Sequence, residues 1–324
     1  MIKVGLIGCG GIGAVHAKSW FELKDRAKLQ AVADFDTKKA TEVAEGKAKV
    51  YSDALKMLQE EELDVVDICL PTFLHAEYVI LALKYVKNVL VEKPVCLNEQ
   101  QAEQMFKAEK ESGGTVHVAQ VVRFDSPYQY LKKVVDSGEY GKVISANFHR
   151  ISPKPIWIKD YDNPEKTGGM AIDMHIHDVD FIRHLMGASP DDVQSSVAKG
   201  EDGIIHHIWG SYRYGNACLV AEASWNYPTS FVFSRCFRVM LEKATLVLDE
   251  SDVLKVYPED GEPFVPEVEE DINKDLGINI SNFGMFLKEI SAFLDYVEFG
   301  KGSGTAPLKD AVEALRIVKK ELEQ

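Results

Sequence analysis

Over its first 120 residues, the chain alternates short apolar runs with stretches of helical periodicity. The apolar runs predict strands at Ile2–Ile7, Lys28–Asp34, Val65–Leu70, Asn88–Val91 and Thr115–Val121. The stretches between them predict helices at Ile12–Leu23, Thr37–Glu45, Leu74–Tyr85 and Glu99–Glu111. Strands that are apolar nearly throughout and are each followed by a helix are typical of a parallel sheet covered on both faces. We therefore predict a doubly wound α/β domain over residues 1–122.

From Arg123 onward the pattern changes to alternating polar and apolar residues, which is typical of strands with one exposed face. Such strands are predicted at Val143–Arg150, Val193–Lys199, Ile204–Tyr214, Ala217–Trp225, Phe231–Leu241 and Ala244–Leu248. Helices are predicted at Ser126–Asp136, Met170–Leu185, Asn282–Phe299 and Leu308–Leu322. Residues 123–324 are therefore expected to form an α+β domain with a large, mostly antiparallel open sheet.

Composition narrows the classes of partner. The 324-residue chain carries a net charge of −14, which argues against nucleic acid and anionic membranes, because both attract basic surfaces. No apolar run in the sequence approaches the roughly 20 residues that a membrane-spanning helix needs. The five cysteines are odd in number and include no CxxC pair, which argues against a disulfide framework or a zinc site. We expect a cytoplasmic protein.

A glycine-rich loop, GCGGIG, lies between the first predicted strand and the first predicted helix. It matches the G-x-G-x-x-G pattern, whose bare backbone holds the pyrophosphate of a dinucleotide at the helix start. Asp34, at the end of the second predicted strand, stands where an acid binds a ribose 2′-hydroxyl. A 2′-phosphate would meet a like charge there, so NAD is favoured over NADP, although Lys38 and Lys39 lie close by. A structural corner without a ligand is the alternative. The expected cofactor-binding residues here are Gly8, Gly10, Gly11, Ile12, Gly13 and Asp34.

Three further strand ends carry polar residues, and ligands of open α/β sheets bind at the carboxyl ends of the strands. In the Glu92-Lys93-Pro94 stretch, the lysine can hold or protonate a substrate hydroxyl and the glutamate can bind a ribose hydroxyl. A surface Glu–Lys pair before a turn proline is the alternative. The residues of interest at the other two ends are Pro71, Thr72, His75 and Gln120.

A second cluster, GGMAIDMHIHDVD, lies on a predicted helix of the second domain. Asp173 and His177 are four residues apart and share one helix face, so a carboxylate and an imidazole meet there in an arrangement suited to general acid–base chemistry. A structural pair is the alternative. His175 and His177 would diverge on a helix, and His206 and His207 would face opposite sides of a strand, so we predict no metal site.

The glycine loop, the Glu92-Lys93-Pro94 stretch and Gly168-Gly169 followed by Asp173 and His177 together resemble the Gfo/Idh/MocA oxidoreductase family, over essentially the whole chain. This is the group of glucose–fructose oxidoreductase and inositol dehydrogenase. The resemblance implies a Rossmann domain followed by a domain whose large open sheet commonly mediates dimers or tetramers. It also implies that the substrate carbinol carbon is surrounded by Lys93, Asp173 and His177, and that the cofactor cleft is lined by Pro71, Thr72, His75, Glu92 and Gln120.

His175 departs from the pattern of the family, which often has a glycine two residues before the histidine. An imidazole at this position would narrow the pocket or contact the substrate. Other pocket candidates lie near the predicted domain junction or in the loop before the second cluster, and they are Arg123, Trp157, Lys159 and Tyr161.

The resemblance implies an NAD-dependent dehydrogenase that transfers a hydride between the nicotinamide and a secondary alcohol or ketone of a sugar, polyol or sugar derivative. In this role His177 is the general base, Lys93 stabilises negative charge on the reacting oxygen, and Asp173 orients His177. Two alternatives bind the same cofactor. One is an NAD-dependent glycosidase that oxidises its sugar transiently, and the other is a non-catalytic NAD-binding sensor.

Overall fold

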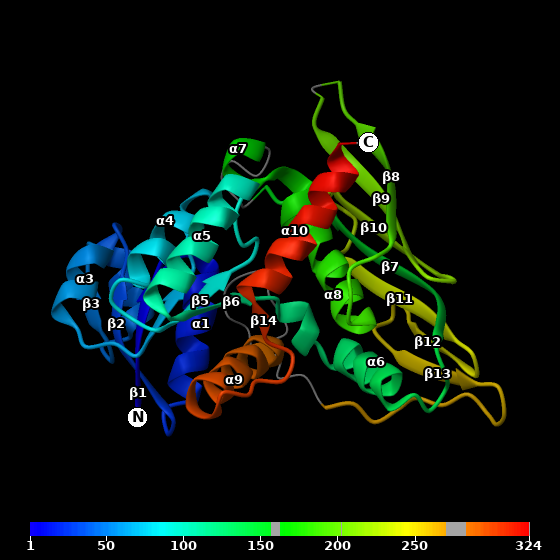
Figure 1. Ribbon diagram of the computed structural model, residues 1–324, viewed down its shortest axis with the longest axis horizontal. Helices are drawn as coiled ribbons and strands as arrows, with labels where there is room; N and C mark the ends of the chain where they lie inside the picture. Colours follow the sequence, from blue (N-terminus) through cyan, green and yellow to red (C-terminus); the bar gives the residue numbers. More distant parts are fainter. Residues whose placement is uncertain (157–162, 202, 270–282, 324) are drawn as a thin grey trace. The chain divides into compact units, whose positions relative to one another are not determined.

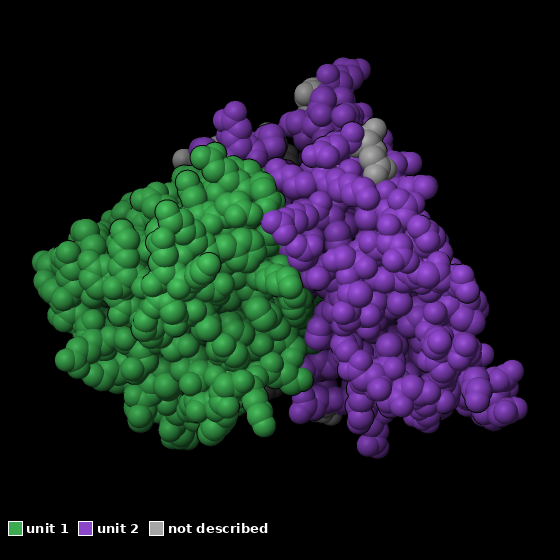
Figure 2. All heavy atoms as spheres, in the orientation of Figure 1, with its two compact units in different colours: residues 1–124, 271–312 green, residues 125–270, 313–324 purple. Residues whose placement is uncertain are grey.

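Two sheets organise the chain, and each belongs to its own unit (Figure 1). The computed structural model describes residues 1–156, 163–201, 203–269 and 283–323. The first unit holds residues 1–124 and 283–312. The second unit holds residues 313–323 and the described residues of 125–269 (Figure 2). The chain passes from the first unit to the second after residue 124 and returns to the first unit after the second sheet.

The sheet of the first unit has the strand order β14-β6-β5-β4-β1-β2-β3. Among these described strands, every pairing is parallel except that of β14 with β6. The order reverses between β1 and β4, and ligands of such sheets bind at the carboxyl ends of the strands beside this point. The predicted doubly wound parallel sheet is confirmed. The strands are β1 Ile2–Ile7, β2 Ala27–Ala33, β3 Lys49–Tyr51, β4 Val65–Ile68, β5 Asn88–Glu92, β6 Thr115–Ala119 and β14 Ala306–Pro307.

Helix α9, Phe283–Phe299, explains why the chain returns to the first unit. It packs against α1, and its Ile290, Phe293 and Leu294 join a buried cluster that also contains Leu6 and Trp20. The apolar stripe of α9 is therefore part of the core of the first unit. The other helices of this unit are α1 Gly11–Glu22, α2 Thr37–Ala44, α3 Ala54–Glu60, α4 Thr72–Ala82, α5 Glu99–Ser112 and the 3₁₀ turn η1 Val121–Phe124.

The sheet of the second unit has the strand order β13-β12-β11-β7-β10-β9-β8. Its described pairings are antiparallel except for β7 with β10, so the predicted large, mostly antiparallel sheet is confirmed. The strands are β7 Val143–Pro153, β8 Asp192–Lys199, β9 Ile205–Tyr214, β10 Ala217–Tyr227, β11 Ser234–Leu241, β12 Ala244–Leu248 and β13 Leu254–Pro258.

One face of this sheet is covered by helices, among them α6 and α8 (Figure 1). Phe148 of β7 and Phe237 of β11 meet Tyr128 and Phe181 from these helices in a cluster of ring contacts. No helix in the described parts of the chain is both long and apolar enough to cross a membrane. The remaining helical segments are α6 Ser126–Ser137, α7 Pro164–Thr167, the π-helical turn η2 Ala171–His175, α8 Ile176–Met186 and α10 Leu308–Leu322, which begins in the first unit.

Candidate active site

The loop after β1 requires glycine at two positions, Gly8 and Gly13, for different steric reasons. Gly8 has a φ of +97°, and a Cβ there would lie 2.4 Å from the carbonyl oxygen of Cys69, so only glycine fits the turn. A Cβ on Gly13 would lie 2.0 Å from the carbonyl oxygen of Gly8, so glycine lets α1 pack against the loop. A Cβ on Gly10 would meet nothing within 4 Å, which leaves the space beside it open.

The start of α1 is prepared for an anion. Its N-cap, Gly10, makes no side-chain hydrogen bond to the helix, and the first turn contains no acidic residue. A hollow of about 420 Å³ lies beside it, lined by Gly11 and Ala14, by the basic Lys18 and Lys39 and by the acidic Glu42 and Glu45. Because the two lysines are matched by two glutamates, the features that suit a diphosphate are the uncapped backbone N–H groups and the helix dipole. The loop therefore fits the pyrophosphate of a dinucleotide.

Asp34 follows β2 and ties the end of that strand to the glycine loop. Its Oδ2 accepts a hydrogen bond of 2.7 Å from the backbone N–H of Cys9, and its Oδ1 accepts one of 2.8 Å from the N–H of Asp36. Burial, and then the charge of Asp34, raises the pKa of the Cys9 thiol to about 12. Phe35, 90% exposed, stands next to Asp34 and offers a free aromatic face. The sequence did not assign Phe35 a role, because it shows the aromatic residue after the acid but not its exposure.

His75, in the first turns of α4, bridges two strand ends. Its Nδ1 lies 2.7 Å from the carbonyl oxygen of Pro94 and its Nε2 lies 2.7 Å from the carbonyl oxygen of Leu70. The ring is buried, and desolvation lowers its pKa. Of its predicted neighbours in the cofactor cleft, Thr72 is buried and Pro71 is exposed.

Lys93 is half-buried at the end of β5, and its backbone is held by the residue before it. Oε2 of the buried Glu92 accepts a hydrogen bond of 2.9 Å from the N–H of Lys93. Oε1 of Glu92 lies 3.1 Å from Nε2 of His16 on α1. The carboxylate thus already has partners on both oxygens within the protein. It links the lysine turn to the helix that follows the glycine loop.

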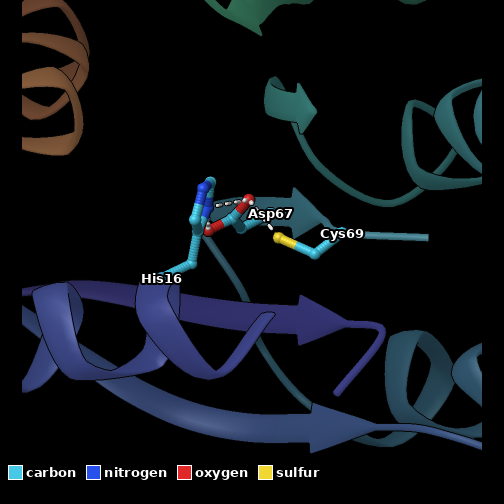
Figure 3. Close-up of side chains that lie close together, drawn as sticks. All are labelled: His16, Asp67 and Cys69. Carbon is cyan, nitrogen blue, oxygen red and sulfur yellow. Dashed lines mark hydrogen bonds and ion pairs between the residues drawn. The ribbon is translucent and has the colours of Figure 1, made fainter. Parts of the chain in front are cut away.

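His16 continues this link to the next strand (Figure 3). Its Nδ1 lies 2.9 Å from Oδ2 of Asp67 on β4, and the same oxygen accepts a hydrogen bond of 2.8 Å from Nε1 of Trp20. Both His16 and Asp67 are completely buried. Burial opposes the charged form, but the contributions of Asp67 and Cys69 together outweigh it and raise the pKa of His16 well above its ordinary value. Both ring nitrogens face carboxylate oxygens, so the geometry favours an imidazolium between Asp67 and Glu92.

His16, Asp67 and Cys69 are residue types that bind metals, and they lie close together (Figure 3). Zinc needs a neutral imidazole and a thiolate. Here both ring nitrogens of His16 already face carboxylate oxygens, of Asp67 and Glu92, and burial raises the pKa of the Cys69 thiol. The Cys69 thiol lies 3.7 Å from Oδ1 of Asp67 and acts as a weak donor. We interpret the group as a hydrogen-bonded ion network.

Two other buried polar residues of the first unit lie near or after β6. Arg123 is 4% exposed and its Nη1 donates to the carbonyl oxygens of Gly304 and Thr305, at 3.4 and 3.1 Å. This contact anchors the segment before β14, and a substrate role for Arg123 stays a prediction. Gln120 is buried at the end of β6, and its Oε1 has no hydrogen-bond partner among the described residues.

In the second unit, Asp173 and His177 lie on consecutive helical segments. Asp173 belongs to the π-helical turn η2 and His177 to the first turn of α8, and both are half-buried. The next residue, Asp178, forms a buried bidentate ion pair with Arg150 of β7, with both N–O distances 3.0 Å. A π-helical turn within a helix is rare and is frequent at functional sites. The predicted continuous helix is thus interrupted where the candidate acid–base residues lie.

His175, between these two residues, is completely buried. Its Nε2 lies 2.9 Å from Oη of Tyr212 on β9 and 3.3 Å from Oε1 of Glu321 on α10. The predicted pocket residues Trp157, Lys159 and Tyr161 lie outside the described residues. The catalytic set as predicted spans both units, with Lys93 in the first and the other two residues in the second.

Comparison with known families identifies the class. Residues 2–120 match the family described as "Oxidoreductase family, NAD-binding Rossmann fold", GFO_IDH_MocA, and residues 128–247 match the GFO/IDH/MocA C-terminal domain. The chain belongs to this family of NAD-binding oxidoreductases. The resemblance drawn from the sequence is confirmed, and so, at the level of the family, is the NAD cofactor.

Among curated proteins, the chain is 32% identical over 196 residues to myo-inositol 2-dehydrogenase of Thermotoga maritima, an alignment that covers 59% of this chain and 57% of that protein. It is 33% identical over 192 residues to scyllo-inositol 2-dehydrogenase (NAD(+)) of Bacillus subtilis, covering 58% and 54%. The matched stretch thus spans little more than half the length of these relatives. A solved oxidoreductase from Agrobacterium radiobacter, in complex with NAD+, L-tartaric acid and magnesium, shares the fold with a TM-score of 0.86, 19% identity and coverage of 99% and 95%.

Proposed function

We propose that this protein is an NAD-dependent dehydrogenase that oxidises a secondary alcohol of a polyol or sugar, with inositol-like polyols as the first class to test. The observation that carries this proposal is the placement of Lys93, which is half-buried at the end of β5. The carboxylate of the preceding residue, Glu92, holds the backbone of Lys93 and contacts His16 on α1, the helix that follows the glycine loop. The inositol dehydrogenases among the relatives support the substrate class.

The residues of the first unit hold the cofactor in this proposal. The uncapped start of α1 and Lys18 bind the pyrophosphate, Asp34 accepts the adenosine ribose hydroxyls, and Phe35 lies against the adenine. The unsatisfied Oε1 of Gln120 accepts a hydrogen bond from the nicotinamide end of the cofactor. When bound, NAD supplies the acceptor for the hydride that leaves the carbinol carbon.

The remaining chemistry is the transfer of one proton. His177 takes the hydroxyl proton as the general base, and Asp173 orients its imidazole. The ammonium group of Lys93 hydrogen-bonds the same oxygen and stabilises the negative charge that develops as the proton leaves. In the reverse direction, His177 returns the proton to the carbonyl oxygen.

The test is substitution of Lys93 combined with a substrate panel. Purified protein is incubated with NAD and inositols, aldoses, keto-sugars or nucleotide sugars, and NADH is followed by absorbance. Lys93→Ala should bind NAD with unchanged affinity by calorimetry and lose at least about a hundredfold in kcat. The exposed Lys84→Ala, on the same unit, is the matched control and should keep full activity.

Three outcomes would refute the proposal. Full activity of Lys93→Ala on the true substrate contradicts the catalytic role of the lysine. Binding of NAD without turnover across the panel indicates a sensor. Release of an aglycone without accumulation of NADH, detected by chromatography of the products, indicates a glycosidase that oxidises its sugar only transiently.

We propose that the protein is a homodimer or homotetramer, assembled through the face of the second sheet that no described helix covers. The register brings Trp209, Met240 and Tyr257, on three different strands, to the face opposite Phe148 and Phe237. These three side chains are 40–45% exposed. Trp209→Glu should then shift the sedimentation coefficient of the protein to that of a monomer. A wild-type protein that already sediments as a monomer at micromolar concentration would contradict this assembly.

A further inference from the structure

Three buried polar side chains of the second unit form a chain of hydrogen bonds that no proposed step uses. Oη of Tyr212 on β9 lies 2.6 Å from Oε1 of Glu321 on α10 and 2.9 Å from Nε2 of His175 on η2. All three residues are at most 1% exposed. Buried polar groups are costly unless they are paired, and here Nε2 of His175, Oη of Tyr212 and Oε1 of Glu321 pair with one another, whereas Nδ1 of His175 and Oε2 of Glu321 have no partner among the described residues.

The sequence makes room for this chain with a glycine. A Cβ on Gly210 would lie 2.0 Å from Oε1 of Glu321 and 2.2 Å from Oη of Tyr212. Gly210 stands two residues before Tyr212 on β9, and a glycine inside a strand weakens that strand. Its place here is explained by the space that the Tyr212 hydroxyl and the Glu321 carboxylate need.

The direction of the hydrogen bonds follows from the chemistry of the groups. Burial, and then the charge of Glu321, raises the pKa of Tyr212 well above its ordinary value. The phenol therefore stays protonated, and its O–H donates a hydrogen bond to Oε1 of Glu321. Nε2–H of His175 then donates to Tyr212 Oη. A second bond, from Oγ of Ser195 on β8 to the carbonyl oxygen of Glu321 at 2.6 Å, fixes the end of α10 to the sheet.

The group therefore connects the π-helical turn to two rigid elements. His175 is the last residue of η2, and it lies between Asp173 and His177 in the chain. A π-helical turn needs support from its surroundings because its backbone geometry is rarely stable alone. On the other side of this segment, Asp178 is held by Arg150. The acid–base segment is thus anchored to the sheet at its middle, through His175, and just after its end, through Asp178.

We propose that Tyr212 and Glu321 are positioning residues that act through His175 to hold Asp173 and His177 in their working geometry. This proposal rests on the proposed function, which gives Asp173 and His177 their roles. It also gives His175 a structural partner inside the protein in place of the substrate contact that the sequence suggested.

The first test is Tyr212→Phe in the full-length protein. This change removes one oxygen and keeps the ring, so His175 and Glu321 both lose the hydrogen bond to the phenol and keep only their direct contact of 3.3 Å, without a large cavity. We expect kcat to fall about tenfold while KM and the affinity for NAD, which the first unit binds, change less than about threefold. Tyr214→Phe is the matched control, because its hydroxyl lies on the same strand and has no hydrogen bond among the described residues. It should leave kcat unchanged.

Conservative substitution separates positioning from general stability. Glu321→Gln keeps an acceptor oxygen for the Tyr212 hydroxyl and should retain most of kcat, whereas Glu321→Ala should lower it as Tyr212→Phe does. Because the three side chains contact one another in one hydrogen-bonded group, the double variant Tyr212→Phe/Glu321→Ala should lose less kcat than the product of the two single losses. Additive losses, or equal losses in Glu321→Gln and Glu321→Ala, would overturn the proposal.

Backbone hydrogen exchange gives a readout that needs no substrate. Tyr212→Phe should speed the exchange of amides at 170–177 and leave those of β10 unchanged. If the wild type oxidises no alcohol, the proposed function fails and exchange alone decides whether the segment is positioned by Tyr212. A lower melting temperature with unchanged exchange at 170–177 and unchanged kcat would show a merely structural role and overturn the proposal.

Discussion

Replacing His16 with alanine should destabilise the protein by about 3–5 kcal/mol, because it leaves two buried carboxylates without their shared cation. Asp67 is completely buried and Glu92 is 8% exposed, so neither recovers full hydration when the imidazole is removed. Nε1–H of Trp20 and N–H of Lys93 remain as donors, but neither carries a charge. The loss is therefore that of an ion pair broken on one side.

The magnitude converts to a large change in melting temperature. A loss of 1 kcal/mol lowers the melting temperature by about 2–4 °C in a domain of 150–250 residues, so His16→Ala should melt about 6–20 °C below the wild type. Scanning calorimetry of the full-length wild type and variant, at the same protein concentration, measures this difference in melting temperature. Glu62→Gln is the control, because the Glu62 side chain is 92% exposed in its pair with Lys3 and should not change the melting temperature.

The difference in melting temperature between the wild type and His16→Ala should depend on pH. The pKa of His16 is raised in the folded protein, so its stabilisation is fully present below its ordinary value of about 6.5 and is lost as pH rises through the folded value. The gap between wild type and His16→Ala should therefore be wider at about pH 6 than at about pH 10. A variant that melts within about 2 °C of the wild type, or a gap that widens with pH, would refute the reasoning.

Three further predictions follow from single residues. Gly13→Ala should lower the affinity for NAD at least tenfold by calorimetry, because its Cβ would lie 2.0 Å from the Gly8 carbonyl oxygen and spread the loop; an unchanged affinity contradicts this. Burial, and then Glu92, raises the pKa of Glu289, so its burial costs stability as pH rises above about 4.5. Glu289→Gln should therefore raise the melting temperature, by a margin that grows as pH rises. A margin that shrinks as pH rises would contradict this. Finally, in the Trp209→Glu variant, whose second sheet is expected to be free of a partner, the exposed Cys218 should be alkylated first at about pH 8, and Cys9, buried with a pKa of about 12, should react far more slowly in peptide mass spectrometry. Equal rates would be inconsistent with the described burial.

The elements that could be predicted are those whose pattern is long or nearly uniform. β1 and β4 are apolar in most positions because both faces of their sheet are covered, and the glycines after β1 mark the turn. β3, Lys49–Tyr51, and α3, Ala54–Glu60, were missed because three and seven residues carry too little periodicity. α9 was predicted as a helix, but its periodicity does not say which core its apolar stripe covers.

Some residues of the candidate site could likewise be predicted from the sequence and others could not. The glycine loop and Asp34 follow from spacing along the chain, whereas the ion network joins residues 51 and 76 positions apart. One signal was readable: Asp67 stands inside an otherwise apolar strand, and a charge there requires a buried partner. Glu289 and Glu321 give the same signal on the buried faces of their helices. Sequence alone names such residues but not their partners, because the partner is set by the packing of distant elements.

The late return of the chain to the first unit has a consequence for synthesis on the ribosome. Residues 1–124 emerge first, yet α9 supplies part of their core and β14 pairs with the edge of β6. Until about three hundred residues have left the exit tunnel, the nascent nucleotide-binding half exposes an apolar surface and an open strand edge, both of which favour aggregation. We therefore expect a chain that stops before α9 to aggregate and not to fold as a small independent domain.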